Sequence, residues 1–210
     1  KALALGAFAV GFAMLSGSTV RAHGQTPQSF SGLPGFGFEF TNCVESVGVT
    51  LVPTASVQAH VPNQFILAGE GQAVTPLIVR TARCGGIATA GHKPTAGEIV
   101  QVGAVIVSPD GTGDISNYTL WYYTSDARLA LRLFQAGVNA QYVPTIDYDY
   151  HAGRNSLEVS VPLPGTPRLE VSGTVSPSSQ PAGAFVANWW QATRGGNIKM
   201  STNVPIINLG

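Results

Sequence analysis

The sequence predicts a single α+β domain that consists mainly of β-strands. Short runs rich in Val, Ile, Tyr and other apolar residues recur along the chain. Frequent Gly (25 residues) and Pro (14 residues) separate these runs, as is typical of turns between short strands. Only one segment has the apolar period of a long amphipathic helix. Hydrophobic residues make up 44% of the chain, which is too apolar a composition for a disordered protein.

The first residues have the order of a secretory signal peptide. Lys1 supplies a positive charge, the uncharged run Ala2 to Leu15 follows, and small residues precede a cleavage position after Ala22. We therefore assign residues 1–22 to a signal peptide and expect a secreted or periplasmic protein. A buried N-terminal helix is the alternative. Because about 20 residues are needed to cross a bilayer, no stable membrane span is expected after signal removal.

The rest of the chain is expected to form an arm and one domain. Residues 23–45 are assigned to an extended N-terminal arm, because Gly, Pro, Ser and Phe are frequent there without a clear period. Residues 46–210 are assigned to a single β-rich domain, since no linker divides them.

The elements of this domain are expected to follow one another closely. A strand at Gly48 to Val52 leads into a short helix, Pro53 to Val61, which Pro62 ends. Glu98 to Val107 is apolar on both faces, as a central strand would be. The remaining strands are expected at residues 73–84, 117–124, 138–150, 157–161, 168–175, 183–193 and 197–202.

The clearest helical pattern begins after residue 124. Ser125 or Asp126 is expected to cap this helix, and Gly137 is expected to end it. Its apolar face is expected to consist of Leu129, Ala130, Leu133 and Phe134.

Charge and cysteine content restrict the function. Only 10% of residues are charged and the formal net charge is zero, so the basic face of a nucleic-acid-binding protein is not expected. In an exported protein, the two cysteines Cys43 and Cys84 predict a disulfide. Two buried free thiols are the alternative.

Two segments of the chain carry a family resemblance. Residues 52–65, VPTASVQAHVPNQF, have the form of a strand and a short helix that ends in a Val-Pro step. Residues 118–148, YTLWYYTSDARLALRLFQAGVNAQYVPTIDY, have the form of an aromatic strand, a helix and a return strand. Over residues 48–150 this order resembles the acetoacetate decarboxylase family. The resemblance implies a curved antiparallel β-barrel or sandwich with one traversing helix and a small internal pocket. A lipocalin-like or other all-β barrel is the alternative.

The catalytic lysine that the family would require is missing from the matching position. In that family a lysine amine forms a Schiff base with a keto acid, just after the traversing helix. Here that stretch reads Gly-Val-Asn-Ala-Gln at residues 137–141. The resemblance also places a pocket carboxylate near Glu98 and a pocket arginine near Cys43. We therefore do not expect Schiff-base decarboxylase chemistry.

We expect a binding module whose pocket holds a small apolar or weakly acidic molecule, without a cofactor. We expect Asn139 and Gln141, in the stretch where the family's lysine is missing, to be polar residues of this pocket, together with Glu98. Gln101 is a further candidate ligand-binding residue, because it interrupts an apolar strand and a buried amide needs hydrogen-bond partners. Backbone groups of neighbouring strands are the alternative partners. The oligomeric state is left open.

Two alternative functions remain at this stage. One is a lysine-independent lyase or isomerase that transfers protons through the carboxylates of Glu98 and Asp147. Asp147 shares a strand face with Asp149, and a merely solvated face is the competing interpretation. The other is a copper protein, because cleavage after Ala22 would give His23 both a free amine and an imidazole. His60, His92 or His151 would supply the second imidazole; otherwise no metal site is expected.

Overall fold

The computed structural model describes residues 12–16, 37–89, 92–151, 154, 156–163, 169–178 and 183–206. As predicted, these residues form a mainly β fold. The elements are β1 (Phe12–Ser16), β2 (Phe38–Pro53), α1 (Thr54–Gln58), β3 (Val74–Thr89), β4 (Thr95–Ile106), β5 (Ile115–Thr124), α2 (Ala127–Gln135), β6 (Ala140–Tyr142), β7 (Asp147–His151), β8 (Ser156–Val161), β9 (Leu169–Ser178), β10 (Gly183–Thr193) and β11 (Gly196–Ile206).

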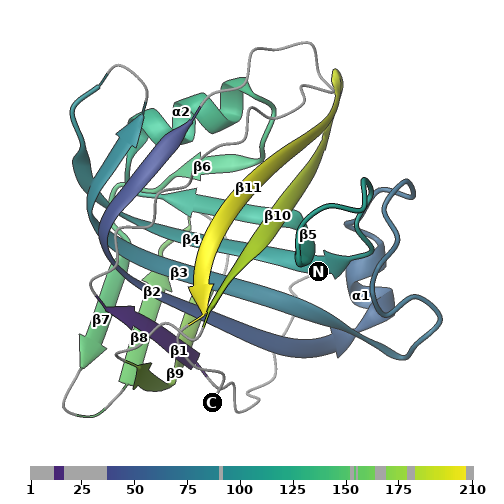
Figure 1. The fold of residues 1–210 in the computed structure, drawn as a ribbon, viewed down its shortest axis with the longest axis horizontal. Coiled ribbons are helices and arrows are strands. Elements are labelled where there is room, and N and C mark those ends of the chain that lie inside the picture. Colours follow the sequence, from purple (N-terminus) through teal and green to yellow (C-terminus); the bar gives the residue numbers. More distant parts are fainter. Residues whose placement is uncertain are drawn as a thin grey trace.

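The centre of the fold is an antiparallel ladder of four long strands, β2 to β5, which is strongly curved (Figure 1). The outer edge of β5 pairs in parallel with β10 at one end and with β6 at the other. A second, antiparallel group consists of β7, β8 and β9. The path of paired strands runs from β11 to β7 without joining its ends, so the described strands form a layered, barrel-like fold and not a closed barrel.

Both faces of the central ladder are buried. Ile99 and Val100 are neighbours on β4, and both are 0% exposed. Because successive side chains of a strand point to opposite faces, Ile99 packs beneath Leu129 and Leu133 of α2. Val100 packs on the opposite face against residues of β7 and β8, including Leu157. The prediction of a central strand at Glu98 to Val107 is therefore confirmed.

The first strand of the ladder begins earlier than expected. Residues 38–45, which were assigned to the N-terminal arm, belong to β2. The regular pairing with β3 omits Asn42, which has a φ of 52°, and resumes at Cys43 opposite Cys84. This irregularity interrupts the period-2 alternation of apolar residues, so the sequence pattern did not reveal the beginning of the strand. Residues 23–36 of the arm lie outside the described residues.

Strand β1 lies within the segment assigned to a signal peptide. Its backbone pairs antiparallel with β2 and parallel with β9, and so connects the two groups of strands. The other residues of the segment 1–22 are outside the described part of the chain. The structure contains the uncleaved chain, and cleavage after Ala22 would remove β1. The signal peptide stays a prediction.

Helix α2 begins where the sequence predicted. The carboxylate of Asp126 accepts a hydrogen bond of 2.7 Å from the backbone N–H of Leu129. Gly137, with a φ of 92°, follows the helix. One detail of the prediction was wrong: Leu129, Ala130 and Leu133 are buried, but Phe134 is 68% exposed. The buried side of this short helix is therefore narrower than the apolar face that the sequence predicted, because Phe134 lies outside it.

The strand expected at residues 138–150 is divided into two. Ala140–Tyr142 forms β6 beside β5, whereas Asp147–His151 forms β7 beside β8. Pro144 lies between them in a bend. Because proline has no backbone N–H and restricts the residue before it, it favours this change of direction.

The predicted disulfide between Cys43 and Cys84 is confirmed, and it joins two adjacent strands, β2 and β3. Both cysteines are 2% exposed and pack with Ile87 and Ile99. The bond therefore links the first two strands of the ladder inside the core.

We expect the Cys43→Ala/Cys84→Ala double variant to lose about 4 kcal/mol of unfolding free energy, because the disulfide closes a loop with a sequence separation of 41. Urea unfolding followed by tryptophan fluorescence measures this loss. Dithiothreitol should destabilise the wild type but leave the double variant unchanged. Equal stability of the oxidised wild type and the double variant would contradict the expectation.

An ion pair joins the β4–β5 turn to β11. Nζ of Lys199 lies 2.6 Å from Oδ2 of Asp110 and 3.1 Å from Oγ1 of Thr112. The Asp110 side chain is 20% exposed. Its burial opposes ionisation, but hydrogen bonds from Lys199 and Thr112 prevail and lower the pKa of Asp110 to about 2.

This lowered pKa predicts a pH dependence of stability. A carboxylate whose pKa is lower in the folded state stabilises the fold above its unfolded pKa and loses that contribution as pH falls through the folded pKa. Asp110→Asn should therefore reduce the loss of stability between pH 5 and pH 2, by about 1 kcal/mol after solvent screening. Urea unfolding at several pH values measures this. Lys199→Met should reduce the loss similarly, and a loss unchanged in both variants would refute the assignment.

Candidate ligand-binding site

The structure separates two residues that the sequence placed in one pocket, Glu98 and Gln101. Both lie on β4, but they are three positions apart, so their side chains point to opposite faces of the ladder. Gln101 is 1% exposed, whereas the Glu98 side chain is 22% exposed. No single pocket can therefore include both side chains.

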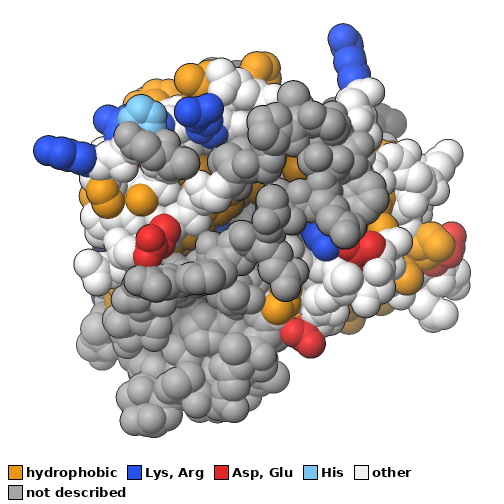
Figure 2. Space-filling model, turned by 45° about the horizontal axis from the view of Figure 1, so that its top comes forward, with side chains coloured by type: hydrophobic (Ala, Val, Ile, Leu, Met, Phe, Trp, Pro, Cys, Tyr) orange, Lys and Arg blue, Asp and Glu red, His pale blue; other side chains and the backbone are white. Residues whose placement is uncertain are grey.

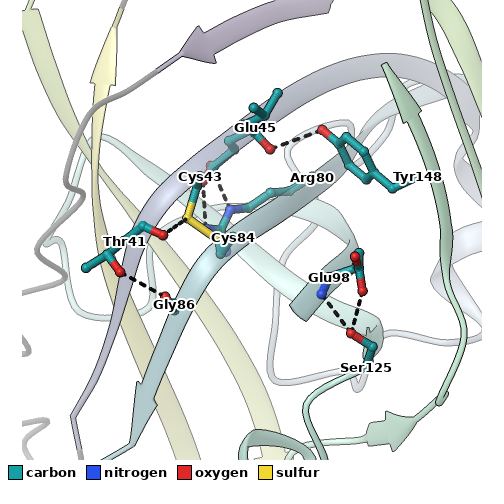
Figure 3. Close-up of a disulfide and its surroundings, with 10 residues drawn as sticks. Thr41, Cys43, Glu45, Arg80, Cys84, Gly86, Glu98, Ser125 and Tyr148 are labelled. Atoms are coloured by element: carbon teal, nitrogen blue, oxygen red, sulfur yellow. Dashed lines mark hydrogen bonds and ion pairs between the residues drawn. A yellow bond between two sulfur atoms is a disulfide. The ribbon is translucent and has the colours of Figure 1, made fainter. Parts of the chain in front are cut away.

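Glu98 is engaged in contacts near the start of α2. Its Oε2 accepts a hydrogen bond of 2.6 Å from the Ser125 hydroxyl (Figure 3). Its Oε1 lies 3.5 Å from Nε of Arg83. Arg83 also donates to the backbone carbonyl of Tyr148, and its guanidinium lies 4.9 Å from the centre of that ring. These contacts fasten β7 to the central ladder.

Asp147 and Gln141 lie at the surface. Asp147 is exposed on β7, and no hydrogen bond or ion pair joins it to Glu98 among the described residues. Its neighbour Asp149 is also exposed and lies 2.9 Å from Nε2 of His151. Gln141 is exposed on β6. The two proposed acid–base carboxylates thus have different surroundings and no direct contact.

Gln101 belongs to a polar row inside the fold. It lies opposite Arg80 on β3 and opposite Tyr122 on β5. Arg80 makes a double hydrogen bond to Glu45, with distances of 2.8 and 2.9 Å (Figure 3). Among the described residues, neither Nε2 of Gln101 nor the hydroxyl of Tyr122 has a hydrogen-bond partner. Gln101 was predicted from the sequence, whereas no sequence pattern indicated Glu45 or Arg80.

Arg80 in this row stays charged despite its burial. Arg80 and Glu45 have side chains that are 4% and 2% exposed. Burial works against the charge of Arg80, but the adjacent Glu45 carboxylate raises the Arg80 pKa above its usual value. Burial also disfavours the charged form of Tyr122. It raises the pKa of the Tyr122 hydroxyl, which therefore stays protonated.

A surface cleft of about 190 Å³ lies at the outer edge of β5. The pairing of β5 with β10 ends at Tyr118, and its pairing with β6 begins at Tyr122. Residues 119–121 therefore have no strand partner along this edge, and the cleft lies beside them. The lining residues are His60, Tyr118, Thr119, Leu120, Trp121, Asn139 and Gln191.

Several polar groups of the cleft have hydrogen-bonding capacity to spare. Nδ2 of Asn139 is 3.5 Å from the backbone oxygen of Leu120, which is longer than the usual range of about 2.7–3.2 Å for an N–H···O hydrogen bond. Oγ1 of Thr119 and Oε1 of Gln191 are buried and have no partner among the described residues. His60 is exposed, and no acidic side chain lines the cleft.

Tyr118 gives the cleft an uncharged wall. Its hydroxyl accepts a hydrogen bond of 3.0 Å from Nε2 of Gln191. Burial raises the pKa of Tyr118, and a hydrogen bond with the Ala192 backbone opposes this rise only in part. Tyr118 therefore stays uncharged at neutral pH.

Of the predicted ligand-binding residues, only Asn139 lines this cleft. His60 was predicted only as a possible copper ligand, and no sequence pattern indicated Gln191 or Thr119. These residues come together because two strands distant in sequence, β6 and β10, pair with the same edge of β5. Local sequence patterns do not reveal such a coincidence.

The copper prediction concerns a residue outside the described part of the chain, His23. Within the described ranges, no group of three or more His, Cys, Asp or Glu side chains is arranged to hold a metal ion. In the same ranges, no helix is both long enough and apolar enough for a membrane span.

The chain matches no protein-family model and no curated protein. The resemblance to the acetoacetate decarboxylase family therefore stays a prediction.

We expect Arg80→Met to destabilise the fold by about 3–5 kcal/mol, because it leaves the Glu45 carboxylate buried without its partner. The Glu45→Leu/Arg80→Met double variant should recover most of this loss, since it removes both charges from the core. Urea unfolding of the two variants and the wild type measures the difference. A double variant as unstable as Arg80→Met would show that the packing of Arg80 matters more than its pairing.

Proposed function

We propose that this protein binds a small, weakly acidic molecule in the cleft at the edge of β5, without Schiff-base chemistry. The observation that carries the proposal is a cleft beside the part of the β5 edge that has no strand partner. Several polar groups that line this cleft have hydrogen-bonding capacity to spare. Asn139 and His60 can donate hydrogen bonds to a carboxylate, and no acidic side chain of the lining would repel one.

The size of the cleft limits the ligand. Pockets for drug-sized ligands are about 300–1,000 Å³. A cleft of about 190 Å³ suits a molecule with fewer heavy atoms than a drug-sized ligand. Most of the lining residues are polar, which favours a hydrophilic acid over the apolar ligand that the sequence left open.

The two lysines outside the predicted signal peptide support binding without a Schiff base. Lys199 is held by Asp110 and Thr112, and its side chain is 14% exposed. Lys93 is exposed in the segment before β4. Neither lines the cleft, so neither offers a free amine to a molecule bound there.

The proposal is tested by titrating the protein with carboxylic acids of two to six carbon atoms and recording ¹H–¹⁵N spectra. We expect the amide signals of Leu120 and Asn139 to shift on binding. Asn139→Asp should weaken binding by about tenfold, because it replaces a donor with a negative charge. A spectrum that no acid changes would refute the proposal.

Gln141→Glu is the matched control. It introduces the same charge two residues away, at an exposed position that does not line the cleft. It should change the affinity by less than about twofold, as is usual for a screened surface charge. An equal loss in both variants would indicate a general charge effect and not a site at Asn139.

A further inference from the structure

Exposed apolar side chains gather at the end of the ladder near α1. Eight large hydrophobic residues of the described chain are substantially exposed, and five of them lie at this end. Figure 2 shows hydrophobic side chains at the right-hand end of the molecule, where α1 lies in Figure 1. The five residues, which we call the end patch, are Val49 (53% exposed), Leu51 (58%), Ile66 (47%), Val74 (43%) and Val107 (54%).

Strand register places the end patch on one face. Val49 and Leu51 are alternate residues of β2, so they share a face, and Val74 lies opposite Pro53 on that same face. Leu67 pairs with Ile106, and the backbone of Val107 donates to Ile66. The side chains of Ile66 and Val107 therefore point to the same side, away from the buried Leu67 and Ile106.

No described element covers this face at the end patch. Helix α1 packs on the opposite face, where Val57 contacts Val52 and Leu77. Strand β10 covers the same face as the end patch, but only further along, where Trp189 packs with Ile78. The end patch thus continues a core cluster beyond the strand that covers it.

We propose that the end patch is the contact surface of a homodimer, with a second copy of this chain as its occupant. The adjoining halves of the three strands, residues 46–53, 74–79 and 101–106, contain no charged residue. The whole chain has a formal net charge of zero. Apart from Glu70, in the loop between Ile66 and Val74, two copies would therefore bring few like charges together in a face-to-face contact. Such a contact has the two-fold arrangement that is commonest among homo-oligomers.

The area of the patch predicts a weak dimer. About half of each of the five side chains is exposed, roughly 400 Å² per chain, against about 800 Å² per partner in an interface of standard size. We expect a reversible dimer with a dissociation constant of about 10–100 μM.

Sedimentation velocity of the full chain at about 2–300 μM tests the proposal over the range in which such a dimer forms. Leu51→Lys and Val107→Lys should each raise the dissociation constant by about tenfold or more, because each places a charge in the contact. Both sites are already exposed, so thermal unfolding at low concentration should change little. A chain that is monomeric over the whole range overturns the proposal and leaves the face to another occupant.

Leu131→Lys is the matched control. Leu131 is 55% exposed but lies on α2, outside the end patch. This variant should dimerise like the wild type. A dimer that Leu131→Lys disrupts, or that survives both patch variants unchanged, would place the interface elsewhere and overturn the proposal.

Discussion

The fold depends on the requirement that both faces of one sheet be buried. Strands β3 and β4 have buried residues on both sides, and a single sheet cannot bury either side by itself. Helix α2 and β10 cover one face, while α1 and the β7–β9 group cover the other. The apolar surface of the protein follows from the same requirement: where β10 no longer covers the ladder, the apolar face of β2 and β3 continues into solvent.

A buried charge pair lies within this apolar sheet, next to the disulfide. Glu45 is two positions from Cys43 on β2, so the carboxylate and the sulfur point to the same face. The ion pair with Arg80 gains little net stability, because desolvation offsets most of the attraction between the charges. It does favour one register, since sliding β2 by one residue would move Glu45 to the other face and leave Arg80 unpaired. The disulfide between the same two strands fixes that register covalently.

Much of the fold could be predicted from local patterns, but the candidate site could not. The cap at Asp126, the two-sided burial of β4 and the Cys43–Cys84 bond each follow from features near in sequence or from simple counting. The order of elements from β2 to β6 also agrees with the expected one. Glu98 and Gln101 show the limit of this reasoning: both are polar positions in one strand, but strand periodicity sends them to opposite faces. The strand period alone was sufficient to separate them, although the resemblance suggested Glu98 and the polarity of Gln101 in an apolar strand suggested the second residue.

The cleft depends instead on topology. Strand β5 has one outer edge, and two parallel strands, β6 and β10, approach it from different parts of the chain. Two strands that share an edge end to end leave backbone without a strand partner between them, here at residues 119–121. The chain segments at that gap then determine which side chains surround it: Asn139 directly precedes β6, and Gln191 lies near the end of β10. A polar cleft thus forms where the pairing is interrupted, because backbone and side-chain groups at such a gap need partners that no neighbouring strand provides.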